Sequence, residues 1–150
     1  MKNKYTKKHK KDDVKNRGEV FTPEWLVEDM LAKLPQKTLL NPVKTVLDNS
    51  CGSGNFLAKV LELRVKGKVD PYDALSTIYG VELDPDNAKE CRDRLVGMIA
   101  EYGGNKPKAR RIVNNNIITG DGLMAGDYWN DKGKRLTDNQ LESGGFTKFC

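Results

Sequence analysis

The sequence predicts an α/β fold with a doubly wound parallel sheet. Short β-branched segments alternate with longer segments whose apolar residues recur at helical spacing. The helical segments are long enough to connect parallel strands, and an acidic residue stands at or just after the end of each predicted strand. Because ligands of such sheets bind beyond the carboxyl ends of the strands, these acidic residues are candidates for a binding site.

The composition is that of one soluble globular domain. The 150 residues are 37% hydrophobic and 31% charged, and no apolar run is long enough to span a membrane. No apolar segment follows the basic N-terminus, so we expect no secretory signal and a cytoplasmic protein. The cysteines are far apart and the chain has one histidine, which disfavours a disulfide framework and a zinc site.

Residues 1–18 predict a flexible basic arm. Residues 1–17 contain seven Lys and one Arg against two Asp, whereas the whole chain has a net charge of +5, so the remainder is close to neutral. The arm is nearly free of aliphatic side chains and is not expected to fold by itself. Its charge would attract nucleic-acid phosphates, and a solvated tail that aids solubility is the plainer interpretation. We expect the folded domain over residues 19–150.

The N-terminal part of this domain predicts a helix followed by a strand. Thr22 is placed to cap the helix, with Pro23 in the first helical position and Pro35 beyond its end. The apolar face of the helix would consist of Trp25, Leu26, Met30, Leu31 and Leu34. Residues 44–48 predict a buried strand that ends in a carboxylate, and residues 49–55 predict a turn of small residues.

Strands and helices continue to alternate after this turn. They are, in order, a helix from Phe56, a helical turn over residues 71–76, a strand over residues 77–82, a helix from Asp84 to Gly103, and a strand over residues 116–118. The polar segment after Trp129 predicts no element before residues 146–150, where a fourth strand would begin. Trp129 itself is expected to pack against the protein.

Three acidic residues therefore gather at one edge of the sheet: Asp48, Glu82 and Asp121. The loop after Asp48 has the pattern Gly-x-Gly, but it lacks the third glycine of a dinucleotide motif and the lysine of a P-loop. An acidic edge is a poor host for a pyrophosphate. It suits a cationic nucleoside without phosphate, such as S-adenosylmethionine, whose ribose hydroxyls would donate to Glu82 and whose adenine amine would donate to Asp121.

Each candidate also has a purely structural explanation. Asp48 is placed to cap the next helix, Glu82 to be a solvated strand end, and Asp121 to stabilise a Gly-Asp-Gly turn. Thr22 is explained as a helix cap, and Phe21 as an apolar residue that packs on that helix. Ligand binding and local structure therefore both remain open for these five residues.

The chain resembles S-adenosylmethionine-dependent adenine-N6 DNA methyltransferases in four motifs that follow in the family's order. These segments are Glu19-Val20-Phe21-Thr22-Pro23, Val46 to Leu57, Tyr79 to Pro85, and Asn116 to Leu123. The resemblance implies a Rossmann-like sheet of the class I methyltransferase type that binds S-adenosylmethionine. It implies the following cofactor-binding residues: Phe21, Thr22, Pro23, Asp48, Asn49, Ser50, Cys51, Gly52, Gly54, Asn55, Phe56, Glu82, Leu83, Asp121, Gly122 and Leu123.

The sequence lacks the catalytic motif of that family. No Asn-Pro-Pro-Tyr or close variant occurs, and Asn41-Pro42 precedes the first strand, which is the wrong place. In the family this motif accepts the hydrogens of the adenine amine and stacks on the flipped base. We therefore expect the chain to bind the methyl donor without transferring the methyl group by itself. We also expect the sheet to stop before its fourth strand, so that a missing C-terminal half or a second chain would cover the edge of the first strand.

The expected function is the S-adenosylmethionine-binding part of a DNA adenine-N6 methyltransferase of restriction-modification or phage type, with DNA as the partner and no membrane. Two alternatives remain open. In the first, the chain is a catalytically inactive remnant or split subunit that holds S-adenosylmethionine or a partner chain. In the second, it belongs to a methyltransferase that acts on RNA or protein. A nicotinamide-dependent enzyme is a more distant alternative, which preferential NADH binding would favour.

Overall fold

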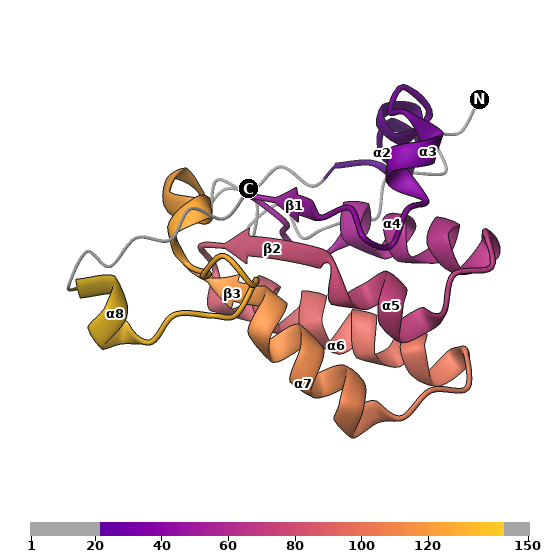
Figure 1. Cartoon of the computed structure of the whole chain (residues 1–150). Coiled ribbons are helices and arrows are strands. Elements are labelled where there is room, and N and C mark those ends of the chain that lie inside the picture. Colours follow the sequence, from indigo (N-terminus) through magenta and orange to yellow (C-terminus); the bar gives the residue numbers. More distant parts are fainter. Residues whose placement is uncertain (1–21, 143–150) are drawn as a thin grey trace.

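A computed structural model of the chain describes residues 22–142 (Figure 1). The predicted basic arm, Phe21 and the predicted approach to a fourth strand lie outside the described residues. The elements are, in chain order, α2 (Glu24–Ala32), α3 (Gln36–Leu39), β1 (Val46–Asp48), α4 (Asn55–Lys66), α5 (Pro71–Ser76), β2 (Ile78–Glu82), α6 (Pro85–Glu101), α7 (Lys106–Asn116), β3 (Ile117–Thr119), a 3-10 helix (Gly122–Asp127) and α8 (Asp138–Glu142). None of these helices is long and apolar enough to cross a membrane.

The three strands form one parallel sheet in the order β1-β2-β3. β1 pairs with β2 through Val46 and Ile78, and β2 pairs with β3 through Gly80 and Ile117. The α/β fold class and the alternating order of strands and helices predicted from the sequence are confirmed. The sheet is open and Rossmann-like but incomplete, because β1 has no strand on its other side within residues 22–142.

Two apolar clusters cover the two faces of the sheet. Because side chains alternate along a strand, Ile78 joins the cluster formed with helices α4 and α6, whereas Tyr79 and Val81 join the other cluster. Trp129 is fully buried in that second cluster, with its ring 5.1 Å from the Tyr79 ring in an edge-on arrangement. Its indole N–H donates to the backbone carbonyl of Asn115 at 2.7 Å. Trp129 is therefore a core residue, which confirms the prediction that it packs against the protein.

Arg64 is a fully buried arginine on α4. Its guanidinium group donates five hydrogen bonds of 2.7 to 3.3 Å, and no carboxylate within residues 22–142 pairs with it. The acceptors are the carbonyl oxygens of Leu39, Asn41, Lys44 and Ala74 and the hydroxyl of Thr77. One side chain therefore joins α4 to the segment before β1 and to the end of α5.

The first helix differs from its prediction. Pro23, not Thr22, is the N-cap, and no side chain caps the helix. The helix ends at Ala32 without needing Pro35, and its buried residues are Val27 and Leu31. The predicted apolar face was wrong in part, because the side chains of Trp25 and Met30 are 49% and 45% exposed.

The first strand is shorter and more exposed than predicted. It spans Val46–Asp48, and Leu47 is 36% exposed, so the prediction of a buried strand was wrong. The reason is its place at the edge of the described sheet, where one side has no neighbouring strand. Three α-helices were not predicted at all, namely the short α3 after Pro35, α7 between α6 and β3, and the short α8, and the 3-10 helix after β3 was not predicted either.

Candidate functional site

The carboxyl ends of the parallel strands bring the acidic candidates to one edge of the sheet. Asp48 ends β1, Glu82 ends β2, and Asp121 follows β3. The glycine-rich loop leaves β1 at this edge and stays close to β2, because the Cys51 amide donates to the Val81 carbonyl at 3.0 Å. The candidate site is thus built around the loop between β1 and α4.

Glu82 holds this loop in place. One carboxylate oxygen accepts from the Gly52 amide at 2.8 Å, and the other accepts from the Asp84 amide at 3.3 Å. Gly52 has φ +54°, a left-handed conformation that favours glycine. A carboxylate has about four acceptor positions, so each oxygen retains capacity for a further donor. Backbone amides therefore fix the direction of the Glu82 side chain without exhausting it.

Asp48 provides a second carboxylate close to that of Glu82. Its Oδ1 accepts from the Ser50 amide at 3.0 Å. Burial raises the pKa of the Asp48 carboxyl, the Ser50 hydrogen bond opposes this, and repulsion from Glu82 raises the pKa further. Two carboxylates near one another favour a cation or a hydrogen-bond donor between them.

A small depression lies between this loop and the start of α2. It is lined by Thr22, Asp48, Ser50, Cys51, Gly52, Ser53, Asn55 and Phe56. Seven of these were predicted as site residues, whereas Ser53 was missed although it lies inside the glycine motif. Glu82, Leu83, Asp121, Gly122 and Leu123 do not line the depression and lie at the neighbouring strand ends, while Asn49 and Gly54 lie in the loop itself.

Asn55 brings the N-terminal motif to this depression. Its side-chain amide donates to the carbonyl oxygen of Thr22 at 3.3 Å, and its Oδ1 accepts from Arg94 of α6 at 2.5 Å. Pro23 follows directly as the N-cap of α2. The first two motifs of the sequence are therefore linked by one side chain, and Arg94 is a supporting residue that the sequence did not reveal.

The N-terminus of α4 gives the site a positive pole. Gly54 is its N-cap, with φ +93° and no side-chain hydrogen bond to the first turn. A Cβ at this position would lie 2.7 Å from Cys91 Sγ, so both the conformation and the space require glycine. The amides of the first turn favour an anionic group, whereas Asp48 and Glu82 favour a cationic one. The site has the polarity of a zwitterionic ligand.

The loop after β3 approaches the loop after β1. A Cβ on Gly122 would overlap the carbonyl oxygen of Asn49, so the two backbones are in close contact. Asp121 is exposed, and its Oδ1 accepts from the Leu123 amide at 2.9 Å as the cap of the 3-10 helix. Leu83 and Leu123 are 75% and 94% exposed at these two strand ends. They provide apolar surface beside the acidic groups.

Cys51 is a packing residue. Both Cys51 and Cys91 are buried free thiols, and a hydrogen bond with Cys91 together with burial raises the pKa of the Cys51 thiol. A Cβ on Gly80 would lie 2.9 Å from Cys51 Sγ, so β2 needs glycine where the loop packs on it. A thiol whose ionisation is suppressed is a poor nucleophile. Cys51 contributes to the site by its small size.

The fold and the site together define a Rossmann-like α/β domain with an acidic site beside a glycine-rich loop. A comparison with known protein families narrows this class to one family. The family model described as N-6 DNA methylase matches residues 3–111, and the chain belongs to this family. Membership supports a DNA N6-methyltransferase-like function. No curated protein and no solved structure matches the chain.

Proposed function

We propose that the chain binds S-adenosylmethionine at this edge of the sheet. Glu82 accepts the ribose hydroxyls, Asp121 accepts the adenine amine, and Leu83 and Leu123 contact the two faces of the adenine ring. The sulfonium and the amino group lie near Asp48, and the carboxylate of the ligand lies near the first turn of α4. The observation that carries this proposal is the Glu82 carboxylate, held by the Gly52 amide at 2.8 Å and close enough to Asp48 for the two carboxylates to repel each other.

The methyl group is proposed to pass to the N6 atom of a flipped adenine in DNA. Family membership supports this acceptor, and restriction-modification or phage DNA methylation is the proposed setting. The adenine amine is a weak nucleophile, so the reaction requires groups that accept its hydrogens and hold it in line with the sulfonium. The 150 residues contain no Asn-Pro-Pro-Tyr, and we expect another segment or chain to supply it.

The edge of β1 is the proposed place where that addition joins the sheet. Leu47 on this strand and Val43 before it are exposed apolar residues, with exposed fractions of 36% and 80%. An unpaired apolar edge favours pairing with another strand. A strand added beside β1 would also bring new residues to the carboxyl edge, next to Asp48.

A calorimetric titration of the full chain with S-adenosylmethionine tests the proposal. We expect micromolar binding, with no binding of NADH under the same conditions, because the acidic edge repels a pyrophosphate. Preferential binding of NADH would overturn the proposal, and so would the absence of S-adenosylmethionine binding by a chain whose circular dichroism shows it folded. A parallel assay with radiolabelled methyl donor and duplex DNA is expected to show no transfer by the chain alone.

Asp48→Asn is expected to separate ligand binding from stability. Asparagine keeps the acceptor for the Ser50 amide but removes a carboxylate whose pKa is raised in the native state. The native carboxyl binds its proton more tightly than the unfolded chain does, so its ionisation lowers the free energy of unfolding as pH rises through that raised pKa. At neutral pH the variant should therefore melt at a higher temperature, yet bind S-adenosylmethionine about 10-fold more weakly, as a lost charged contact implies.

The pH dependence supplies the check on this prediction. The affinity of the unmodified chain should fall as pH decreases through the raised pKa of Asp48, and the affinity of Asp48→Asn should stay constant over that range. Asp70→Asn makes the same change at the exposed cap of α5 and should leave the affinity unchanged. A variant that loses stability while keeping its affinity would contradict the assignment of Asp48.

Gly122→Ala is expected to push the β3 loop away from the β1 loop. Its Cβ would overlap the Asn49 carbonyl, and such overpacking typically costs about 1–3 kcal/mol of stability. The displaced Asp121 should also lower the affinity for S-adenosylmethionine in calorimetry. The matched control is Gly97→Ala on α6, where a Cβ meets nothing within 4 Å. That control should gain about 0.5–1 kcal/mol in urea denaturation, because alanine is the better helix former.

A further inference from the structure

Helix α7 has an unusual distribution of charge. It carries four basic side chains and no acidic one: Lys106, Lys108, Arg110 and Arg111. Lys106 and Lys108 lie in the first turn, where the positive end of the helix dipole disfavours a cation, and the last turn has no basic residue. This is the reverse of the arrangement that stabilises a helix, so helix stability does not explain these charges.

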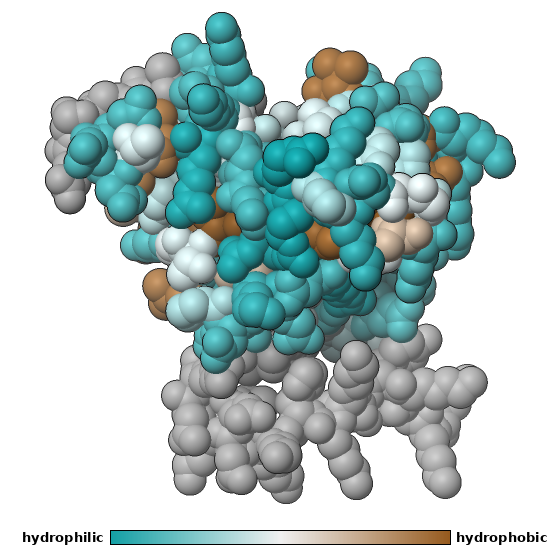
Figure 2. Space-filling view, turned by 90° about the horizontal axis from the view of Figure 1, so that it is seen from below, coloured by the Kyte–Doolittle hydropathy of each residue, from teal (hydrophilic) through white to brown (hydrophobic). Residues whose placement is uncertain are grey.

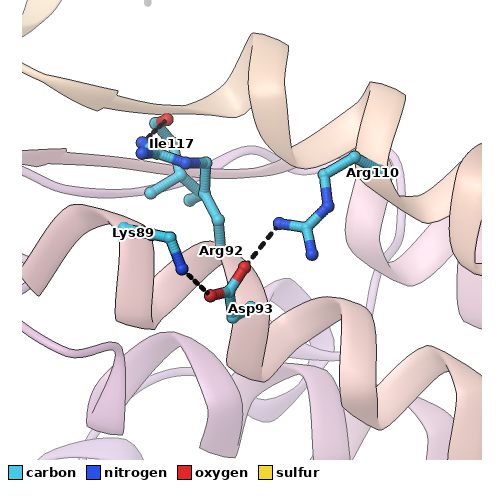
Figure 3. A network of polar contacts seen from close by, with 5 residues as sticks. All are labelled: Lys89, Arg92, Asp93, Arg110 and Ile117. Atoms are coloured by element: carbon cyan, nitrogen blue, oxygen red, sulfur yellow. Dashed lines mark hydrogen bonds and ion pairs between the residues drawn. The ribbon is translucent and has the colours of Figure 1, made fainter. Parts of the chain in front are cut away.

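Some of the nearby cations are used to hold the helices together (Figure 3). Asp93 on α6 accepts from Arg110 at 2.7 Å and from Lys89 at 2.7 Å. Arg92 donates to the Ile117 carbonyl at 3.1 Å. These contacts fix α7 and β3 against α6 and leave the remaining cations of α7 without this role.

The remaining cations of α7 have no carboxylate partner among the described residues. Lys106, Lys108 and Arg111 are exposed, and within residues 22–142 no ion pair involves them. The Lys108 ammonium lies 4.0 Å from the centroid of the Tyr72 ring, a contact that orients the side chain without neutralising it. The outer side of α7 therefore presents uncompensated positive charge.

A loop extends this charge beyond the end of the helix. Asn115 follows Lys108 and Arg111 at helical spacing, on the same side of α7. Its amide donates to the Gly133 carbonyl at 2.8 Å, and its Oδ1 accepts from the Arg135 amide at 2.9 Å, so the loop over residues 130–135 lies against the end of the helix. The loop exposes three basic side chains and one acidic side chain, which are Lys132, Lys134, Arg135 and Asp131.

We define the α7 row as Lys108, Arg111, Lys132, Lys134 and Arg135. The face of the molecule that carries α6 and α7 is predominantly hydrophilic (Figure 2), with no large apolar patch that would favour burial against another protein. Between Lys108 and Asn115, where the loop joins it, α7 rises about 10 Å, enough to pass about three phosphates of one B-DNA strand, which recur about every 3.4 Å along the axis. The row has the charge and length of a phosphate contact.

We propose that the α7 row binds the phosphate backbone of duplex DNA. The choice of DNA rests on the proposed function, whereas the row itself is separate from the candidate site. Helix α7 leads into the amino end of β3, whereas the candidate site lies at the carboxyl ends of the strands. The row therefore holds the duplex without reading its bases, and it increases the time that the chain spends on DNA of any sequence.

The test is fluorescence anisotropy of a labelled 20-base-pair duplex with the full chain at several salt concentrations. The triple variant Arg111→Ala, Lys132→Ala and Lys134→Ala should bind at least about 10-fold more weakly in low salt. The slope of log affinity against log salt should decrease in magnitude by about 3, because each lost phosphate contact releases about one counterion fewer. The melting temperature should change little, because the three side chains are exposed and make no ion pair in residues 22–142.

The matched control removes three charges elsewhere on the surface. Lys37, Lys44 and Lys68 are exposed, and Lys37→Ala, Lys44→Ala and Lys68→Ala should leave the salt slope unchanged. Both triple variants retain residues 1–18, so any contribution of that basic segment cancels. Equal losses in the two variants would overturn the proposal, as would binding of poly-glutamate through the row without binding of DNA, which would indicate an acidic protein partner. S-adenosylmethionine affinity, measured on the same variant, distinguishes failure of this proposal from failure of the candidate site.

Discussion

Glu82→Gln is expected to weaken S-adenosylmethionine binding about 100-fold, because two charge-assisted hydrogen bonds of about 1.5–3 kcal/mol each would lose their charged acceptor. Glutamine preserves the shape of the side chain, and its amide oxygen should still accept from the Gly52 amide, which lies 2.8 Å from the Glu82 carboxylate oxygen in the unmodified chain. The glycine loop therefore stays anchored. Only the longer 3.3 Å contact with the Asp84 amide loses its acceptor within the protein, and the rest of the loss falls on the ligand. Calorimetric titration measures the affinity, and a thermal melt shows whether the fold is retained.

Glu90→Gln supplies the control for this change. Glu90 is an exposed carboxylate on α6, the helix that follows Glu82 in the chain. The same isosteric substitution there alters the net charge equally but should leave the affinity within twofold. An unchanged affinity in Glu82→Gln would remove this residue from the site and with it the central contact of the proposed function.

Arg64→Met is expected to lower the free energy of unfolding by about 3–5 kcal/mol, because a buried hydrogen-bond network is broken and each buried carbonyl left without a donor costs about 1–3 kcal/mol. Methionine has a similar length but removes all five hydrogen bonds, and the carbonyls of Leu39, Lys44 and Ala74 lose the donor that Arg64 provides. The Asn41 carbonyl still accepts from the Lys44 amide, and the Thr77 hydroxyl still donates to the Pro42 carbonyl. A domain of this size has a total stability of about 5–15 kcal/mol, so the variant should be marginal or unfolded at 37 °C. Urea denaturation followed by circular dichroism measures the difference.

Two further variants define the cause of that loss. Arg64→Lys retains the positive charge and three donors, and it should recover part of the stability because some of the carbonyls are paired again. Arg111→Met removes an exposed arginine and should change the free energy of unfolding by less than about 0.5 kcal/mol. If Arg64→Met were as stable as Arg111→Met, the buried carbonyls would have found other donors.

The elements with strong local signals could be predicted from the sequence. Asp84 caps α6 by accepting from the Asp86 and Asn87 amides, as Asp-Pro at a helix start indicates. β2 was predicted to within one residue, because its apolar and β-branched residues are bounded by polar segments. This apolar pattern fits its position, where four of its five residues are buried. The position of the acidic residues at one edge of the sheet could be predicted because the carboxyl ends of parallel strands lie at the same edge.

Helix α7 shows where the sequence signal was too weak. Its buried residues are Ala109, Val113 and Asn116, which contain only one large apolar side chain. Asn116 is 3% exposed and donates to the carbonyls of Ser76 and Ile78, so an amide occupies a position where periodicity expects an aliphatic residue. The helix is held by its Asn105 cap, the ion pair between Arg110 and Asp93, and this amide, none of which a hydrophobic pattern reveals.

Long-range contacts account for the rest of what the sequence did not reveal. The link from Asn55 to Thr22, the contact between Gly122 and Asn49, and the acceptors of Arg64 each join segments that are distant in the chain. The residue types at the candidate site could be predicted because ligand chemistry constrains them. The supporting groups could not, because any donor that reaches the same acceptor would serve equally well.

The two buried thiols provide a direct way to measure local opening of the glycine loop. Cys51 is 5% exposed and Cys91 is fully buried, so a thiol reagent reaches them only when the loop moves away from α6. In a chain with Cys150→Ser, the labelling rate at low reagent equals the intrinsic rate multiplied by the fraction of molecules that are open. Labelling kinetics therefore report the free energy of that single motion, separately from global unfolding, and a ligand that holds the loop closed slows the labelling in proportion to its occupancy.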